Sequence, residues 1–428
     1  MHLYKPSLQG TYKPTLFALS INKNKVLNGQ NQLKDEYGNI FFHEYIHYLQ
    51  DILTSFGLQN ICSLARKFSV VNHEILGSAL SDFAIPYVST NKSLQLDEER
   101  FELIEGTFML LDNSRNFEVI NIELDPYLLN PELADQSYIN VNILYRDNSE
   151  TDAFYLGAFH FLENMAHILE RNFSIEDRVP PFPYKVIEKI TKSAFPYGDF
   201  SDINFIRIIE MALESHDPAN YYFTFYRFCM DHDLAFTKET IELYKNINAL
   251  NWGREKYDYN NFYYPNATMA RKAFDAMFIH DNLKPLKEWG RLLISNGIKI
   301  RRSGFSFNDL LVVNGDYDRV KKKTGWLIKR LGTPIMTDNG FGVFLSSPDG
   351  KISEDSMIYL LGLEAVLNIL NGDTACSIFP YCSNGQGGPI VTNASCKTAP
   401  WDRTKITPLC LLAQMWIMWG FVKKNCHV

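Results

Sequence analysis

The chain lacks the features that would place it in a membrane or in an oxidising compartment. Its first residues, Met1 to Pro6, contain no apolar signal core. The longest apolar run, Leu409 to Val422, is too short to cross a bilayer and contains Gln414. The seven cysteines are an odd number, which favours reduced thiols. We therefore expect a cytoplasmic protein with no membrane partner, in which the run from Leu409 to Val422 forms a buried helix.

The cysteines also lack the spacing of a common metal motif. Cys376, Cys382 and Cys396 lie close together in the sequence, yet no two of them form a C-x-x-C pair. Buried free thiols are the favoured interpretation, and a structural zinc or iron–sulfur site is the alternative. We expect these three cysteines to be unbridged by disulfides.

There is no excess of positive charge and no internal repeat. The chain has 42 Lys and Arg against 49 Asp and Glu, a net charge of −7, which argues against a general nucleic-acid-binding protein. The basic run from Arg319 to Arg330 is typical of a solvated helix face. Aromatic residues make up 14% of the 428 residues, so we expect a large packed core.

Hydrophobic periodicity predicts a mainly α protein with a small β-sheet, an α+β fold. The first predicted helix is expected to end at Gly57. Helices are predicted at 38–56, 62–85, 97–112 and 152–171. From residue 180 onward the chain is predicted to form successive helices, which include those at 266–296, 315–331 and 354–370. Strands are predicted at 15–21, 117–122 and 138–145, with a hairpin at 335–346 around Asn339-Gly340.

What the sequence does contain is an H-E-x-x-H run at residues 43–47, inside the first predicted helix. His43 and His47 share one helix face, so both imidazoles can bind one metal ion. Glu44 is placed to reach a water polarised by that metal without being a ligand itself. Zinc suits nitrogen ligands and an open position. The alternative is a pair of core histidines bonded to neighbouring groups.

Catalytic zinc generally takes a third protein ligand. We prefer Glu163, on an apolar segment where His160 and His167 lie on the same helix face. His160, His167, His73 and Glu74 are the alternative third ligands. If they do not bind metal, His160 or His167 can stabilise a developing oxyanion, as can a tyrosine.

Asp51 lies four residues after His47 on the same helix face. It can accept the ring N–H of that histidine and fix its tautomer. The alternative is an exposed helix carboxylate.

The segment with the H-E-x-x-H run and the later segment with Glu163 together resemble the gluzincin branch of zinc metallopeptidases. They also resemble uncharacterised bacterial metallopeptidase-like proteins, which pair an H-E-Y-x-H-Y/F-x-Q-D helix with a later L-x-E-x-x-A helix. The resemblance implies His43, His47 and Glu163 as zinc ligands and Glu44 as general base. His167 stands where that branch often has Asp. We accordingly expect a zincin-like catalytic domain at 1–256 and a helical C-terminal region with a cysteine-rich tail at 257–428.

The sequence thus predicts a zinc-dependent hydrolase, a metallopeptidase acting on a peptide or protein substrate with Zn²⁺ as cofactor. Glu44 would take a proton from the attacking water and pass it to the leaving amine. One alternative is a catalytically silent metal-binding regulatory or interaction protein. Another is a zinc amidohydrolase acting on a non-peptide amide. The substrate and the oligomeric state are left open.

Overall fold

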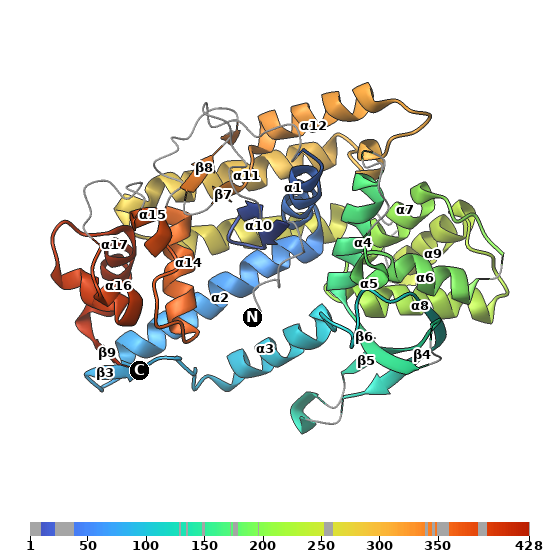
Figure 1. Ribbon diagram of the computed structural model, residues 1–428. Helices are drawn as coiled ribbons and strands as arrows, with labels where there is room; N and C mark the ends of the chain where they lie inside the picture. The colour runs from blue at the N-terminus through green and yellow to red at the C-terminus, as the bar shows by residue number, and fades with distance from the viewer. Residues whose placement is uncertain are drawn as a thin grey trace.

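The computed structural model is mainly helical, with three small sheets among the described residues (Figure 1). This architecture confirms the predicted mainly α fold with a small β content. The structure describes residues 10–21, 38–127, 130–133, 136–147, 150–171, 173, 179–195, 197–251, 260–338, 341–344, 347–348, 359–383 and 392–427.

The first two helices, α1 (Gly38–Leu53) and α2 (Ser55–Gly77), are separated by Thr54 alone. The Thr54 hydroxyl accepts a hydrogen bond from the Gly57 N–H at 3.0 Å and caps α2. The prediction that Gly57 ends the first helix is therefore wrong, because Gly57 lies in the first turn of the second. A Cβ at this position would lie 2.4 Å from the Gln50 carbonyl oxygen, so only glycine lets the two helices approach this closely.

Helices from the second half of the chain pack against α1 and α2. Helix α10 (Asn260–Met277) runs along α2, and α11 (Lys284–Arg302) lies against both α10 and α1 (Figure 1). Tyr263 on α10 donates a hydrogen bond to the carbonyl oxygen of Ile52 at 2.8 Å. Helix α12 (Tyr317–Leu331) packs on α11. The helices from the second half of the chain therefore support both α1 and α2.

A four-stranded sheet joins residues 10–21 to residues 335–344. Its order is β1-β2-β7-β8, and β2 pairs with β7 in parallel, with Ala18 opposite Ile335. The hairpin predicted at 335–346 is confirmed by β7 and β8, and its expected turn, Asn339-Gly340, lies outside the described residues. The strands are β1 (Gly10–Lys13), β2 (Ala18–Ile21), β7 (Ile335–Asp338) and β8 (Phe341–Phe344).

A second, three-stranded sheet confirms the strands predicted at 117–122 and 138–145. They form β4 (Phe117–Pro126) and β5 (Ser137–Tyr145), which pair antiparallel. Alternate residues of β5 are buried, which is the pattern that the alternating sequence predicts for a half-buried strand.

The third strand of this sheet, β6 (Thr151–Leu156), leads directly into α4 (Ala158–Glu170). The helix predicted at 152–171 is therefore wrong over its first turns, which form this strand. Gly157 joins the two elements, and a Cβ there would lie 2.3 Å from the carbonyl carbon of Glu105. The absence of a side chain at Gly157 lets the start of α4 contact the end of α3 (Lys92–Glu105).

Other predicted boundaries also differ. The helix predicted at 62–85 ends at Gly77, and β3 (Asp82–Ala84) follows and pairs in parallel with β9 (Asn425–His427). The helix predicted at 97–112 begins and ends earlier, as α3 (Lys92–Glu105).

The helix predicted at 266–296 is two helices, α10 and α11, because Pro285 starts a new first turn. The helix predicted at 315–331 is confirmed by α12, and that at 354–370 is described from Tyr359 only. The remaining helices are α5 (Pro181–Tyr184), α6 (Val186–Ala194), α7 (Asp202–Ala212), α8 (Pro218–Asp231), α9 (Lys238–Asn251), α14 (Tyr359–Leu370), α15 (Phe379–Ser383), α16 (Ser395–Thr398) and α17 (Leu411–Met418).

The buried C-terminal helix is confirmed by α17, which is shorter than the predicted run because Gly420 adopts the left-handed conformation after it. Trp416 and Trp419 are both buried. Within the described ranges, no helix combines the length and apolar character needed to cross a bilayer. The proposed domain boundary at 256–257 lies outside the described residues, so the division into two domains stays a prediction.

Candidate metal centre

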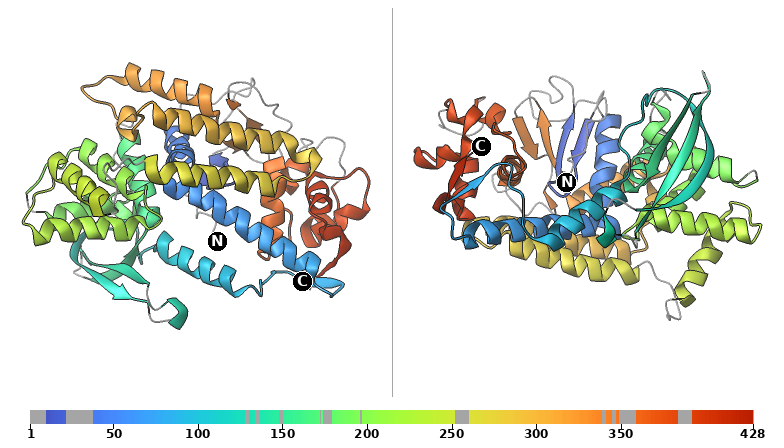
Figure 2. Two further views of the ribbon diagram at one scale, coloured as in Figure 1. Left: turned by 180° about the vertical axis from the view of Figure 1, so that it is seen from behind. Right: turned by 90° about the horizontal axis from the view of Figure 1, so that it is seen from below.

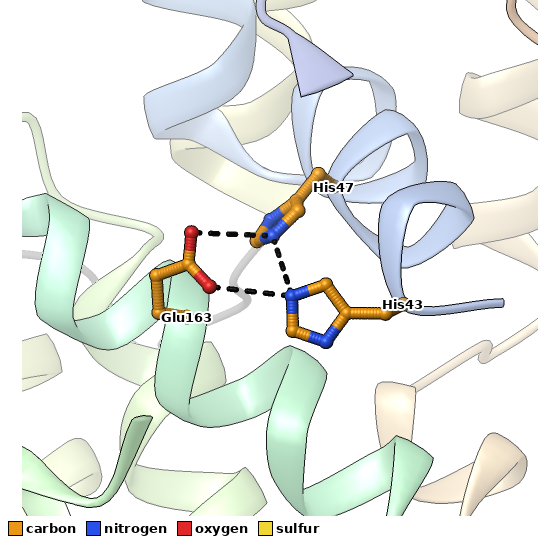
Figure 3. A group of neighbouring side chains, drawn as sticks. All are labelled: His43, His47 and Glu163. Atoms are coloured by element: carbon orange, nitrogen blue, oxygen red, sulfur yellow. Dashed lines mark hydrogen bonds and ion pairs between the residues drawn. The ribbon is translucent and has the colours of Figure 1, made fainter. Parts of the chain in front are cut away.

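The candidate centre lies where α1 and α4 pack side by side, and it brings together His43, His47 and Glu163 (Figure 3). The Nε2 atom of His43 lies 3.2 Å from one carboxylate oxygen of Glu163, and the Nε2 atom of His47 lies 3.6 Å from the other. The two Nε2 atoms are 3.3 Å apart. The structure thus places the preferred third ligand against both histidines across more than a hundred residues of sequence.

The three side chains form a donor set that could hold a metal ion. Their ligand atoms all lie within 4.8 Å of one another, and no other group of this kind is found in the described part of the chain. His43 is 6% exposed, His47 4% and Glu163 4%. Two imidazole nitrogens and a carboxylate oxygen suit zinc and other divalent transition metals.

The Nδ1 atom of each imidazole, on the ring edge away from the centre, also has a side-chain partner. The Nδ1 atom of His43 lies 2.9 Å from a carboxylate oxygen of Glu170, and Nδ1 of His47 lies 2.8 Å from Oε1 of Gln50. Gln50 in turn donates from its amide nitrogen to the carbonyl oxygen of Leu162 at 3.1 Å. An N–H on each Nδ1 would point at these acceptors and leave both Nε2 lone pairs directed at the centre.

Glu170 and Gln50 are the site residues that the sequence reasoning missed. Glu170 lies seven residues after Glu163, and Gln50 lies three after His47. These separations place Glu170 on the same face of α4 as Glu163, and Gln50 on the same face of α1 as His47. Helical spacing was therefore the available signal.

Asp51 occupies a different place from the one predicted. Its carboxylate accepts a hydrogen bond from the Tyr12 hydroxyl at 2.9 Å and one from the Thr15 N–H at 2.8 Å. The position beside Nδ1 of His47 is taken by Gln50. Asp51 is also buried, so the alternative of an exposed carboxylate is wrong as well. Its role is to attach α1 to the turn between β1 and β2.

His160 does not join the ligand group, although it shares a helix with Glu163. Its ring centroid lies 5.1 Å from those of both Phe154 and Phe182, and its Nδ1 accepts a hydrogen bond from the Gly157 N–H at 3.1 Å. Burial lowers the pKa of His160 to about 3, so the ring is neutral at physiological pH. Its Nε2 atom is buried without a hydrogen-bond partner. The ring therefore belongs to an aromatic pocket beside the centre.

His167, on the same helix, is not part of the ligand group either. It is buried, and its ring centroid is 6.0 Å from that of Tyr184, which is itself 5.8 Å from that of His43. The other alternative third ligands, His73 and Glu74, lie on α2. Glu74 bonds there to hydroxyl groups of the segment that precedes α3, so it belongs to a different part of the fold.

The charges of the centre depend on one another. Burial alone would lower the pKa of His43, but its bonds to Glu163 and Glu170 raise it well above its ordinary value. Burial would raise the pKa of Glu163, but the charges and hydrogen bonds of His47 and His43 lower it to about 2. Glu44, 3% exposed, has a pKa raised by burial to about 7, against the opposing effect of the two imidazoles.

Comparison with models of protein families, with curated proteins and with solved structures found no match to this chain. The function is therefore inferred from the geometry of His43, His47 and Glu163 and from the surrounding residues.

Proposed function

We propose that the protein is a zinc-dependent hydrolase and, more specifically, a metallopeptidase. The observation that carries the proposal is the buried His43–His47–Glu163 group, together with Glu44 beside the first histidine. A zinc ion held by these three residues would supply a Lewis acid that polarises a carbonyl group and acidifies water. The zincin-like core and the resemblance to gluzincins are part of this proposal.

In the proposed reaction, the side chains of the chain orient the centre and move the proton. Glu170 and Gln50 keep the two imidazole rings in one tautomer and one orientation. A carboxylate oxygen of Glu44 accepts the proton of the attacking water and then gives it to the leaving nitrogen. The substrate would be a peptide or protein. All seven cysteines are free, which supports the reducing, cytoplasmic compartment that we infer.

One observation favours a second candidate function. His43, Glu44, His47 and Glu163 are each at most 6% exposed, which is deep for a site that must admit a peptide backbone. A metal-binding regulatory or interaction protein admits no substrate to the metal, so its site can stay buried. The two candidates agree on metal binding and differ only in catalysis.

The test is to measure zinc content and peptide hydrolysis on the same preparations. We expect Glu44→Gln to retain the zinc content of the unsubstituted protein and to lose turnover by a factor of about 100 or more, since the proton carrier is removed. Glu239→Gln, an exposed carboxylate on α9, is the matched control and should leave both quantities unchanged. A His43→Ala, His47→Ala double variant should contain about one zinc per chain less than the unsubstituted protein.

Two results would contradict the proposal in different ways. Full zinc content in the double histidine variant would place the metal elsewhere. Zinc bound in the expected way, with no hydrolysis of a mixed peptide library by the unsubstituted protein, would favour the silent metal-binding protein.

A further inference from the structure

Four cysteines of the C-terminal region converge on one small cavity. Cys376 precedes α15, Cys382 lies in α15, Cys396 lies in α16, and Cys410 is the cap residue of α17; all four line the cavity. The Cys376 N–H donates to the carbonyl oxygen of Cys396 at 2.8 Å, which ties the first and third together. This cysteine cluster lies at the opposite end of the molecule from α4 and the histidine centre (Figures 1 and 2).

Backbone N–H groups point at two of these sulfurs. The Sγ atom of Cys410 accepts from the Ala413 N–H at 3.5 Å, at the N-terminus of α17, and the Sγ atom of Cys376 accepts from the Ile378 N–H. Such donors and the end of a helix stabilise a thiolate. Burial has the larger effect and raises the pKa of Cys376 to about 12 and that of Cys382 to about 11.

Arg403 provides the second, independent observation. It lines the same cavity, is 2% exposed, and its Nε atom has no hydrogen-bond partner. The nearby carboxylate of Asp402 pairs with Lys405 instead, and no ion pair of Arg403 is found among the described residues. A buried guanidinium without a counter-charge is costly, so an anionic group in this cavity would stabilise the fold. Four thiolates around one divalent ion, or around an iron–sulfur cluster, carry a net negative charge.

We propose that Cys376, Cys382, Cys396 and Cys410 bind a metal centre as thiolates, with Arg403 as its buried counter-charge. The ligands select thiophilic metals, either a single zinc ion or an iron–sulfur cluster. No three of the sulfurs lie within 4.8 Å of one another in the described chain, whereas a tetrahedral zinc requires sulfurs roughly 3.8 Å apart. A single zinc ion would therefore draw the sulfurs closer together, whereas an iron–sulfur cluster accommodates sulfurs that lie farther apart.

The centre would be structural. It would join the segment after α14 to α16 and α17. This role explains why cysteines without a C-x-x-C pair converge in the fold, and why they are unbridged.

The experiment uses the full-length His43→Ala, His47→Ala variant, so that the histidine centre holds no metal. The protein is produced with added zinc and iron, purified without oxygen, and analysed for zinc, iron and acid-labile sulfide. We expect about one zinc per chain, or iron with a matching amount of sulfide and visible absorption. Adding Cys376→Ser and Cys410→Ser should reduce the metal to background, while Cys62→Ser, a partly buried thiol on α2, should not.

Arg403 has its own readout. Arg403→Gln should reduce the retained metal several-fold, and Arg403→Lys, which keeps the positive charge, should restore part of it.

A second measurement requires no cysteine variant, in case those variants fail to fold. The same histidine variant is alkylated before and after treatment with a strong chelator, and the modified cysteines are identified by peptide mass spectrometry. We expect the four cluster cysteines to be protected until the chelator is added. Alkylation that the chelator leaves unchanged, a disulfide within the cluster, or metal that survives the cysteine substitutions would overturn the proposal.

Discussion

Replacing Glu170 by Gln tests the outer support of the histidine centre. The carboxylate of Glu170 lies 2.9 Å from Nδ1 of His43, and its side chain is only 19% exposed, so solvent screens this contact weakly. Gln has nearly the same shape and can still accept a hydrogen bond through Oε1. The substitution therefore removes the negative charge while it keeps the geometry, and the ring of His43 loses a charge-assisted partner.

The size of the effect follows from the role of such partners. A residue that orients and polarises a ligating histidine typically contributes about 10-fold to 100-fold to metal affinity. That range corresponds to about 1.4–2.8 kcal/mol. We place Glu170→Gln near the lower end, because the hydrogen bond survives. Glu170→Ala, which removes the acceptor, should lie near the upper end.

The assay is a competition for zinc between the protein and a chelating dye at fixed pH and salt. Glu239→Gln serves as the control for charge removal at a distant exposed site. An affinity of Glu170→Gln within about twofold of the control would refute the reasoning. It would mean that His43 does not ligate the metal through Nε2, or that its orientation is fixed without Glu170.

Three further changes test the fold around the centre. Arg301→Met should destabilise the protein by about 3–5 kcal/mol in urea unfolding, because it leaves Glu210 and Glu214 buried without their cation. Gly157→Ala should cost about 1–3 kcal/mol and weaken zinc binding, since its Cβ would collide with backbone of Glu105 beneath α4. Burial raises the pKa of Glu105 to about 8 from an ordinary 4.5. The folded chain therefore retains a proton that the unfolded chain loses, and stability should fall as pH rises from 4.5 to 8. Glu105→Gln should remove this fall in melting temperature.

Each of these has a matched control. Arg291→Met breaks an exposed pair with Asp275 and should cost less than about 1 kcal/mol. Gly325→Ala lies on α12 with nothing near its Cβ position and should not destabilise the protein. Glu102→Gln, an exposed neighbour of Glu105, should leave most of the pH dependence in place. If a control variant changed stability or its pH dependence as much as the corresponding test variant, the contacts assigned above would be contradicted.

The parts of the fold that the sequence predicted are those with a local pattern. Alternation located β4 and β5, and apolar periodicity located α1, α12 and the core of α17. The missed strands have no such pattern. β6 runs into a helix without a polar break, and β3 is three residues long and pairs with the far end of the chain. A partner more than three hundred residues away leaves no trace in local spacing.

The same division applies to the candidate centre. The spacing of His43 and His47 is a helical repeat, and Glu163 was recognisable as a carboxylate within an apolar stretch. The partner of Asp51 was not recognisable, because Tyr12 and Thr15 reach it from a strand and turn that precede α1 by many residues. Local spacing predicted His47 as the partner of Asp51, whereas in the folded protein the partners are Tyr12 and Thr15.

All the groups that build the histidine centre lie on two helices. α1 carries His43, His47 and Gln50, while α4 carries Glu163 and Glu170. The centre therefore depends on how these helices cross, and the crossing is fixed by contacts that bind no metal.

One such contact is the bond from Gln50 to the carbonyl oxygen of Leu162, which joins α1 to the α4 backbone one residue before Glu163. Another is the close approach at Gly157, which sets where α4 begins. On the other side, Asn164 bonds to Glu188 of α6 and limits the rotation of α4 about its axis. A helix held at its start, middle and outer face presents its carboxylates at a fixed position. Metal affinity should for this reason be sensitive to substitutions at these three contacts, none of which involves a ligand.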